Sequence, residues 1–224
     1  MPPYVDIHTH ARSPASGRVA LVCVDPSSPT APLSPGIRLC SGVHPWKACD
    51  PEAKDAFASL VVATRSGRLS AIGESGIDRF RKEIPMAAQL EFFRMHIALS
   101  EEFRLPLVIH SVRSHPDILS EFAKSRPRSP WIVHGCSAGP IEIGRLLDKG
   151  ISVSFGPREL SRPGARATLE QTPPEAFFLE TDDSGTPIEQ VYDTAMALLG
   201  WGLDRLASQM HSNWARLFGS NGLD

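Results

Sequence analysis

Two histidines near the amino terminus have the spacing of side chains that could share one metal ion. Residues 4–10 begin as an apolar segment and place His8 and His10 two positions apart. Successive side chains of a β-strand alternate between its faces, so both imidazoles would point the same way. Imidazole nitrogens bind a divalent metal ion at about 2.0–2.1 Å. A surface strand with two polar tips has the same pattern, so the later segments decide between these interpretations.

Metal-binding residue types recur where further apolar segments end. They are His44 after 37–43, Glu74 after 69–73, His110 at the end of 106–110, His134 at the end of 130–134, and Asp182 after 176–181. The carboxyl ends of the strands of an α/β barrel form one rim, where the active sites of such barrels lie. Four of these five histidines, together with the two carboxylates, already exceed the needs of one tetrahedral ion, so the pattern favours two divalent metal ions.

Eight apolar, β-branched segments alternate with helical patterns along most of the chain, which predicts an α/β fold with a parallel sheet. The expected strands are 4–8, 18–24, 37–43, 69–73, 106–110, 130–134, 151–155 and 176–181. The expected helices are 85–104, a segment that begins after 114 or 115, 140–149, 162–171, 187–199 and 203–218. Eight strands with crossovers predict a TIM (β/α)8 barrel.

The first two connections between the expected strands predict an irregular barrel. Only residues 11–17 join the first two strands, whereas a parallel crossover usually needs about a dozen residues or more. Residues 25–36, which join the next two strands, contain four prolines that exclude an ordinary helix. We therefore expect the first two crossovers to be short or free of helix.

Length and composition predict one globular domain over residues 1–224. The net charge is −2, with 23 basic and 25 acidic residues, which argues against capture of nucleic acid by the surface as a whole. The four cysteines form no C-x-x-C pair, and the sequence shows neither a signal-peptide pattern nor a long apolar run. We expect a cytoplasmic protein that is monomeric and has no membrane partner.

Several polar residues near the expected strand ends could contact a substrate or support the metal ligands. Arg79, Arg113 and Arg158 lie in predicted loops, where they could bind phosphate oxygens, although solvated loop charge has the same pattern. Glu180 shares a strand face with the carboxylate two residues later, so it could orient a metal ligand or pair with a basic residue. Asp78 could be a ligand or the cap of a loop.

Six short motifs occur in order along the chain. They are Asp6-Ile-His8-Thr-His10, Gly42-Val-His44-Pro45, Ala71-Ile-Gly-Glu74-Ser-Gly-Ile-Asp78, Pro106-Leu-Val-Ile-His110-Ser111, Val133-His134-Gly-Cys-Ser-Ala-Gly139 and Glu180-Thr-Asp182. Together with the closing segment 213–218, they resemble the TatD family of metal-dependent hydrolases. The resemblance covers nearly the whole chain, and the ordered set is more specific than any one motif.

The resemblance implies a metal-dependent hydrolase with a TIM barrel, acting as a phosphodiesterase or deoxyribonuclease, exonuclease-like, on nucleic acid or a nucleotide. It implies two divalent metal ions, Mg or Mn by family habit, while the histidine-rich set favours Zn, Mn or Fe. By motif, His8, His10, Glu74 and Asp182 would hold one ion, and Glu74, His110 and His134 the other, with Glu74 bridging. Glu74, Asp182 and His44 would be catalytic, with His44 facing the substrate.

Two departures from the family pattern concern the walls of the cleft rather than the ligands. The family usually has a longer first crossover that includes a helix, and its Phe-Ser-Gly after the sixth-strand histidine is here Cys136-Ser-Ala-Gly139. Two alternatives therefore remain open beside the nuclease. The same site could hydrolyse a small amide, lactone or ester, or the barrel could be a binding module without catalysis.

Overall fold

The computed structural model describes residues 4–11, 18–28 and 36–219. Its contacts divide the chain into two compact units, which are described here one at a time. The first unit falls within Met1–Val22, Pro32–Arg38 and His134–Asp224, and the second within Cys23–Ala31 and Leu39–Val133. A single domain over 1–224 stays a prediction. Among the described helices, none combines the length and the apolar character needed to cross a membrane.

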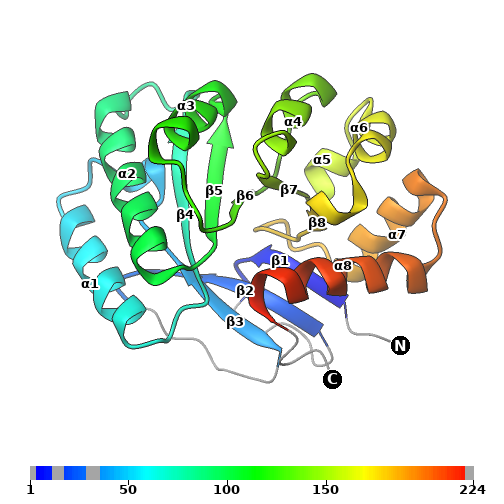
Figure 1. The fold of residues 1–224 in the computed structure, drawn as a ribbon, viewed down its shortest axis with the longest axis horizontal. Helices are drawn as coiled ribbons and strands as arrows, with labels where there is room; N and C mark the ends of the chain where they lie inside the picture. Colours follow the sequence, from blue (N-terminus) through cyan, green and yellow to red (C-terminus); the bar gives the residue numbers. More distant parts are fainter. Residues whose placement is uncertain (1–3, 12–17, 29–35, 220–224) are drawn as a thin grey trace. The chain divides into compact units, whose positions relative to one another are not determined.

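Parallel strands form the centre of the first unit (Figure 1). They are β1 (Tyr4–Thr9), the first part of β2 (Arg18–Val24), β7 (Ser152–Phe155) and β8 (Phe177–Leu179). β1 pairs with β2, and β7 pairs with β8, in both cases in parallel. An isolated bridge between Thr9 and Asp182 joins the end of β1 to the segment that follows β8. The end of β1, with His8 and His10, therefore lies beside Asp182, as the sequence predicts.

The helices of the first unit cover these strands with apolar faces. They are α4 (Pro140–Leu147), α5 (Pro157–Leu160), α6 (Ala165–Gln171), the 3-10 turn η2 (Pro174–Ala176), α7 (Ile188–Leu199) and α8 (Leu203–Phe218). In α8, Leu206, Met210 and Trp214 recur at helical spacing and are all fully buried. Asn213 of α8 donates hydrogen bonds to the carbonyl oxygens of Pro174 and Phe177, which fixes α8 against the start of β8.

The second unit contains most of β3 (Ile37–Ser41), followed by β4 (Ala71–Asp78), β5 (Leu107–Val112) and β6 (Trp131–Val133). Each of these strands pairs in parallel with the next one along the chain. The connections hold the 3-10 turn η1 (Pro45–Lys47), α1 (Ala53–Arg65), α2 (Met86–Phe103) and α3 (His115–Ser125). This alternation is the βαβ pattern, and it brings the carboxyl ends of β3, β4 and β5 to one edge.

The structure confirms most of the predicted elements and corrects others. β5 extends to Val112, so His110 lies inside this strand and not at its end. The prediction missed α1. The expected helix 162–171 is α6, which begins later, at Ala165, and the short helix α5 that precedes it was not predicted. β4 extends to Asp78, so the expectation that Glu74 follows this strand is wrong, because Glu74 lies inside it. Of the two connections expected to lack a helix, residues 12–17 and 29–35 lie outside the described residues, and 26–28 form a turn.

The length of β4 depends on glycines that allow an irregular register with β5. The register shifts between Ile72 and Ser75. A Cβ atom added at Gly73 would lie 2.3 Å from the carbonyl oxygen of Val108, and one added at Gly76 would lie 2.0 Å from that of His110. Both positions have positive φ angles, 129° and 150°. Only glycine allows β4 to pass this close to β5 on both sides of Glu74.

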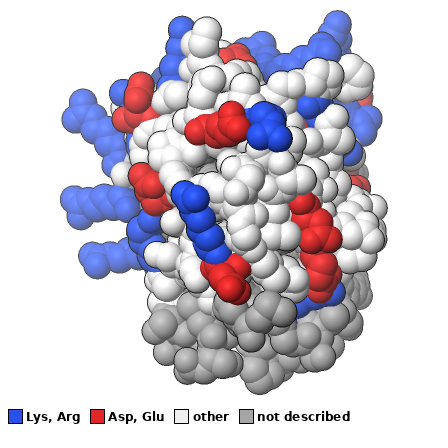
Figure 2. Space-filling view, turned by 90° about the vertical axis from the view of Figure 1, so that its right-hand side faces the viewer, with Lys and Arg blue, Asp and Glu red and all other residues white. Residues whose placement is uncertain are grey.

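Charges of both signs share the surface of the described chain. Figure 2 shows Lys and Arg side chains gathered along one edge of the face in view, with Asp and Glu side chains among the uncharged residues elsewhere on it. This mixture agrees with the net charge of −2. A net charge this close to zero gives the chain as a whole little attraction for a polyanion.

A buried histidine joins α2 to the residue that precedes His44. Nε2 of His96 accepts a hydrogen bond from the backbone N–H of Val43 at 2.9 Å, and Nδ1 lies 2.7 Å from the carbonyl oxygen of Phe92. These partners require neutral imidazole with its proton on Nδ1. Burial lowers the pKa of His96 from 6.5 to about 4, although the hydrogen bond to Phe92 opposes this shift.

We predict that His96 makes the protein less stable as the pH falls from about 6.5 toward 4. The pKa in the folded state lies below that of the unfolded chain, so the unfolded state takes up the proton first and gains stability. From the pKa values of 6.5 and about 4, the full loss is on the order of 3 kcal/mol. Denaturant unfolding at pH 7.5 and pH 4.5 should show a smaller change for His96→Gln than for the wild type. Equal changes in both proteins would contradict this role.

Candidate metal centre

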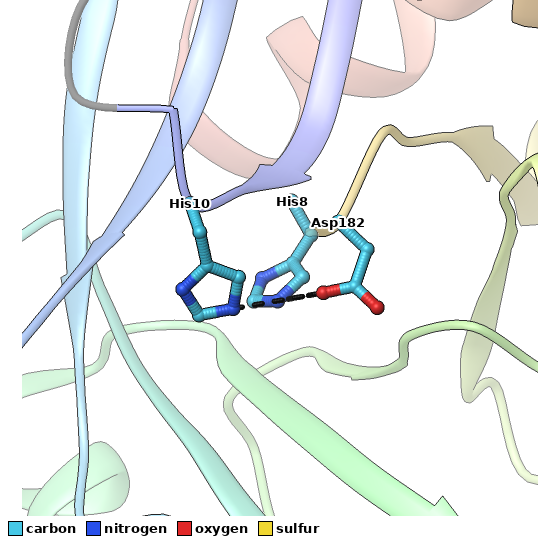
Figure 3. Close-up of side chains that lie close together, drawn as sticks. All are labelled: His8, His10 and Asp182. Carbon is cyan, nitrogen blue, oxygen red and sulfur yellow. Dashed lines mark ion pairs between the residues drawn. The ribbon is translucent and has the colours of Figure 1, made fainter. Parts of the chain in front are cut away.

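Three side chains of the first unit converge at the carboxyl end of β1 (Figure 3). Nε2 of His8 and Nε2 of His10 each lie 3.6 Å from the same carboxylate oxygen, Oδ1 of Asp182. His8 is completely buried, whereas the side chain of His10 is 41% exposed and that of Asp182 is 29% exposed. The group therefore has one closed side and one side that a ligand can reach. The expectation that His8 and His10 point the same way is confirmed.

Backbone hydrogen bonds hold Asp182 beside the two histidines. The N–H of Asp182 donates to the carbonyl oxygen of His8 at 3.0 Å, and the N–H of His10 donates to the carbonyl oxygen of Asp182 at 3.2 Å. Asp182 has a φ of 51°, in the left-handed region that aspartate tolerates better than most residues. The chain thus turns at this point and directs the carboxylate back toward β1.

A buried carboxylate supports this arrangement from below. Asp6 of β1 accepts hydrogen bonds from the backbone N–H of Thr181 at 3.1 Å and from its hydroxyl at 2.7 Å. Burial raises the pKa of Asp6 to about 7, even though both hydrogen bonds from Thr181 lower it. Because Thr181 precedes Asp182 directly, the Asp6–Thr181 contact fixes the position of a candidate ligand from the neighbouring strand.

His134, which follows β6, lies with the ligands of the first unit. Its ring centroid is 4.3 Å from that of His8, and its Nδ1 lies 3.6 Å from Oε1 of Glu180. Glu180 also accepts a hydrogen bond from the hydroxyl of Ser154. Burial raises the pKa of Glu180, but the contacts with His134, His8 and Ser154 outweigh this effect and lower it, so the carboxylate is ionised. Of the two open roles for Glu180, orientation of a histidine fits the structure.

A second group of three side chains lies in the second unit, where β3, β4 and β5 run side by side. Oε2 of Glu74 lies 3.5 Å from Nε2 of His44 and 3.4 Å from Nδ1 of His110. The two imidazole nitrogens are 3.3 Å apart. The three atoms form a nearly equilateral triangle. Glu74 is 7% exposed, so the desolvated carboxylate depends on these neighbours.

His110 and His44 each make a hydrogen bond with the ring nitrogen that lies outside this triangle. That hydrogen bond determines whether the nitrogen inside the triangle is a donor or an acceptor. Nε2 of His110 lies 3.3 Å from Oδ2 of Asp78, a carboxylate that only accepts, so this nitrogen carries the proton and Nδ1 keeps a lone pair. Nδ1 of His44 accepts from the backbone N–H of Trp46, so the proton of neutral His44 is on Nε2. His110 is therefore suited to bind a metal ion, and His44 to donate a hydrogen bond.

Asp78 makes several hydrogen bonds that hold this group in position. Burial raises its pKa, but hydrogen bonds from His110, from the indole of Trp46 and from the backbone N–H of Phe80 outweigh that effect and lower the pKa to about 2. Gln89 accepts from the backbone N–H of Asp78 at 2.7 Å. Asp78 therefore caps the loop after β4, as one interpretation of the sequence has it, and also orients His110.

The donor atoms in both units fit divalent metal ions. Glu74 Oε2 and His110 Nδ1 both present lone pairs, which can accept from the Nε2–H of His44, 3.5 and 3.3 Å away, or bind a cation. Ligands bound tetrahedrally at 2.0–2.1 Å are about 3.4 Å apart, which is close to the 3.4 Å of this pair and to the 3.6 Å from Asp182 to His8 and to His10. The same separations exceed the usual 2.7–3.2 Å of an N–H···O hydrogen bond.

The three arginines predicted to bind substrate have different surroundings. Arg79 forms a two-pronged ion pair with Asp117, at 2.6 and 2.8 Å. Arg113 lies with its guanidinium 5.4 Å from the ring centroid of Phe80. Arg158 lies in the first turn of α5. Substrate binding by these arginines stays a prediction.

The sequence patterns do not predict some of the residues that support the candidate ligands. Trp46, Gln89 and Ser154 were not singled out, and Asp6 was noted only as part of a motif. The position of Trp46 two residues after His44 was a signal that could have identified it. Gln89 and Ser154 act through hydrogen bonds with Asp78 and Glu180, which lie in other segments of the chain. Local sequence patterns do not show such contacts.

The chain belongs to the TatD related DNase family, whose sequence model matches residues 29–219. Among its curated relatives, the metal-dependent hydrolase YabD of Bacillus subtilis is 27% identical over 146 residues, or 63% of this chain and 56% of that protein. YcfH of Escherichia coli, also named a metal-dependent hydrolase, is 26% identical over 79% of this chain and 72% of its own length. The chain thus spans little more than half the length of some relatives.

Solved structures give the fold. The TatD homolog YjjV of Escherichia coli superposes with a TM-score of 0.81 at 19% identity, over 96% of this chain and 97% of that one. A TatD family hydrolase of Entamoeba histolytica also gives a TM-score of 0.81, at 13% identity, over 98% of this chain and 99% of that one. The predicted α/β class and TIM (β/α)8 barrel fold are confirmed.

We predict that Thr181→Val weakens metal binding by the first unit about 10- to 100-fold. The substitution keeps the shape of the side chain but removes the hydroxyl that donates to Asp6 and contacts Thr9, so Asp182 is held less firmly. Competition with a chromophoric chelator for Zn²⁺ or Mn²⁺ measures the change in affinity. Thr181→Ser keeps the hydroxyl and should bind like the wild type. Unchanged affinity in Thr181→Val would show that this contact does not position Asp182.

Proposed function

We propose that the chain is a metal-dependent hydrolase that cleaves phosphodiester bonds in nucleic acid. The observation that carries the proposal is the convergence of lone-pair donors of imidazoles and carboxylates at spacings that suit divalent cations. Membership of the TatD related DNase family supports a phosphodiester as the substrate. A relative from Pantoea ananatis, 30% identical over 63% of this chain and 56% of that protein, is named a 3'-5' ssDNA/RNA exonuclease. Exonuclease action by this chain is part of the proposal.

The proposed cofactors are two divalent metal ions. His8, His10 and Asp182 would hold one ion, and Glu74 and His110 would hold the other. Ligation by His134, next to Glu180, and a bridging role for Glu74 stay predictions from the family resemblance. Histidine-rich sets favour Zn or Mn, and carboxylates also suit Mg, so the ligands are compatible with each of these three metals.

The residues of this chain have distinct parts in the proposed reaction. Bound divalent ions would lower the pKa of a water molecule toward neutrality and offset the charge of the phosphoryl oxygens. The carboxylate of Asp182, 29% exposed, can accept the proton of the attacking water. His44, which carries its proton on Nε2, can donate a hydrogen bond to a phosphoryl oxygen as negative charge develops there. Asp78 keeps His110 in the tautomer that binds metal.

A cytoplasmic location and a monomeric state stay predictions from the sequence. The alternative of a small amide, lactone or ester as substrate uses the same ligands, so the arrangement of these residues does not separate it from nuclease action. A substrate panel does so directly. Hydrolysis of an oligonucleotide in preference to amides and lactones is the expected result.

We predict that His110→Ala lowers metal-dependent cleavage of a single-stranded oligodeoxynucleotide by at least about 100-fold. Loss of a residue that supports a ligand typically costs 10- to 100-fold, and loss of the ligand should cost more. Cleavage is measured with Mn²⁺, Mg²⁺ or Zn²⁺, and EDTA should abolish it. His211→Ala, which changes a histidine of α8, is the matched control and should cleave like the wild type. Equal cleavage by the His110→Ala and wild-type proteins would overturn the proposed function.

A further inference from the structure

Two aromatic side chains of the second unit are exposed beside the candidate metal ligands. Trp46 is 45% exposed and Phe80 is 65% exposed. Trp46 lies in η1, after β3, and Phe80 lies in the loop after β4. Large aromatic surfaces are favourable to bury, so their exposure at strand ends near a candidate active site points to a ligand that covers them.

One carboxylate anchors both aromatic residues and one candidate ligand. Oδ2 of Asp78 accepts a hydrogen bond from the indole N–H of Trp46 at 2.7 Å, and Oδ1 accepts from the backbone N–H of Phe80 at 2.8 Å. The same carboxylate orients His110, whose ring centroid is 6.0 Å from that of Trp46. The ring of His44 lies 4.8 Å from Trp46 in an edge-to-face arrangement. The aromatic surface is therefore held at a fixed position next to the chemistry.

Each exposed ring has an arginine over it. The guanidinium carbon of Arg81 lies 4.0 Å from the ring centroid of Trp46, and that of Arg113 lies 5.4 Å from the ring centroid of Phe80. Arg81 also forms an exposed ion pair with Glu83 at 3.6 Å, a kind of contact that contributes little in water. Guanidinium groups next to exposed aromatic rings can bind phosphates, and both groups stack on bases.

This combination fits single-stranded nucleic acid better than a protein partner. Aromatic and Arg side chains are also enriched at protein interfaces, but here they lie beside His44 and His110, where the substrate of a phosphodiesterase must bind. Bases that are not paired expose their faces, so they can stack on indole, phenyl or guanidinium groups without regard to sequence. A duplex keeps its bases stacked on one another, so it cannot use these rings without unstacking.

We propose that Trp46 and Phe80 form a stacking surface for the bases of single-stranded nucleic acid, with Arg81 and Arg113 at its phosphates. The inference rests on the proposed function, because it names the part of the site that holds the nucleic-acid strand next to the scissile bond. Stacking a base on one aromatic ring contributes enough that its removal weakens binding roughly 5- to 150-fold. The stacking surface determines the affinity for the nucleic acid, and the histidines and carboxylates carry out the cleavage of the bond.

Phe80→Ala is the decisive variant, because Asp78 contacts the backbone of Phe80 and not its ring. Fluorescence anisotropy with a labelled oligothymidylate, in EDTA to prevent cleavage, should show at least about fivefold weaker binding for Phe80→Ala. Phe80→Tyr keeps an aromatic ring and should bind like the wild type. Val62→Ala removes an exposed apolar side chain from α1 of the same unit and is the matched control.

A second measurement separates this inference from the proposed function. With metal present, the ratio of kcat/KM for the oligonucleotide to kcat/KM for bis(p-nitrophenyl) phosphate should fall by at least about fivefold in Phe80→Ala. Wild-type affinity for oligothymidylate in Phe80→Ala overturns the stacking surface, even where both substrates are cleaved. A wild-type protein that cleaves neither substrate overturns the proposed function. Equal affinity for oligothymidylate and its duplex with oligoadenylate would also contradict the stacking surface.

Discussion

The arrangement of the candidate site depends on lone-pair acceptors that the fold holds 3.4 Å from each other. Glu74 Oε2 and His110 Nδ1 are 3.4 Å apart, and Asp78 holds the proton of His110 on the opposite side of its ring. Neither atom can donate to the other in this state. The Nε2–H of His44 lies 3.5 and 3.3 Å from these two atoms, and a divalent cation bound to both would satisfy their lone pairs more fully.

The backbone supplies the rigidity that this constraint requires. Asp182 is held by backbone hydrogen bonds to the end of β1, and the neighbouring Thr181 is held by Asp6. Asp78 has the corresponding task in the second unit, where it joins His110 to the loop after β4. In each unit a buried carboxylate, Asp6 or Asp78, supports the position of a candidate metal ligand, which is common around metal ligands.

The sequence predicts that His8, His10 and Asp182 lie together because their placement depends on local rules. Strand alternation puts His8 and His10 on one face, and the parallel strands bring Asp182 to them. The position of Glu74 inside β4 was not predicted, because it depends on how Gly73 and Gly76 allow β4 to approach β5. The donor role of His44 was likewise hidden, since it follows from a hydrogen bond with the backbone of Trp46. Periodicity cannot show contacts of this kind.

Anomalous diffraction from crystals grown with Mn²⁺ or Zn²⁺ tests directly whether the two groups of candidate ligands bind metal ions. We expect anomalous peaks within bonding distance of two sets of atoms. One set is the Nε2 atoms of His8 and His10 with a carboxylate oxygen of Asp182, and the other is Nδ1 of His110 with a carboxylate oxygen of Glu74. Well-ordered crystals in which these atoms bind no ion at millimolar metal would contradict it.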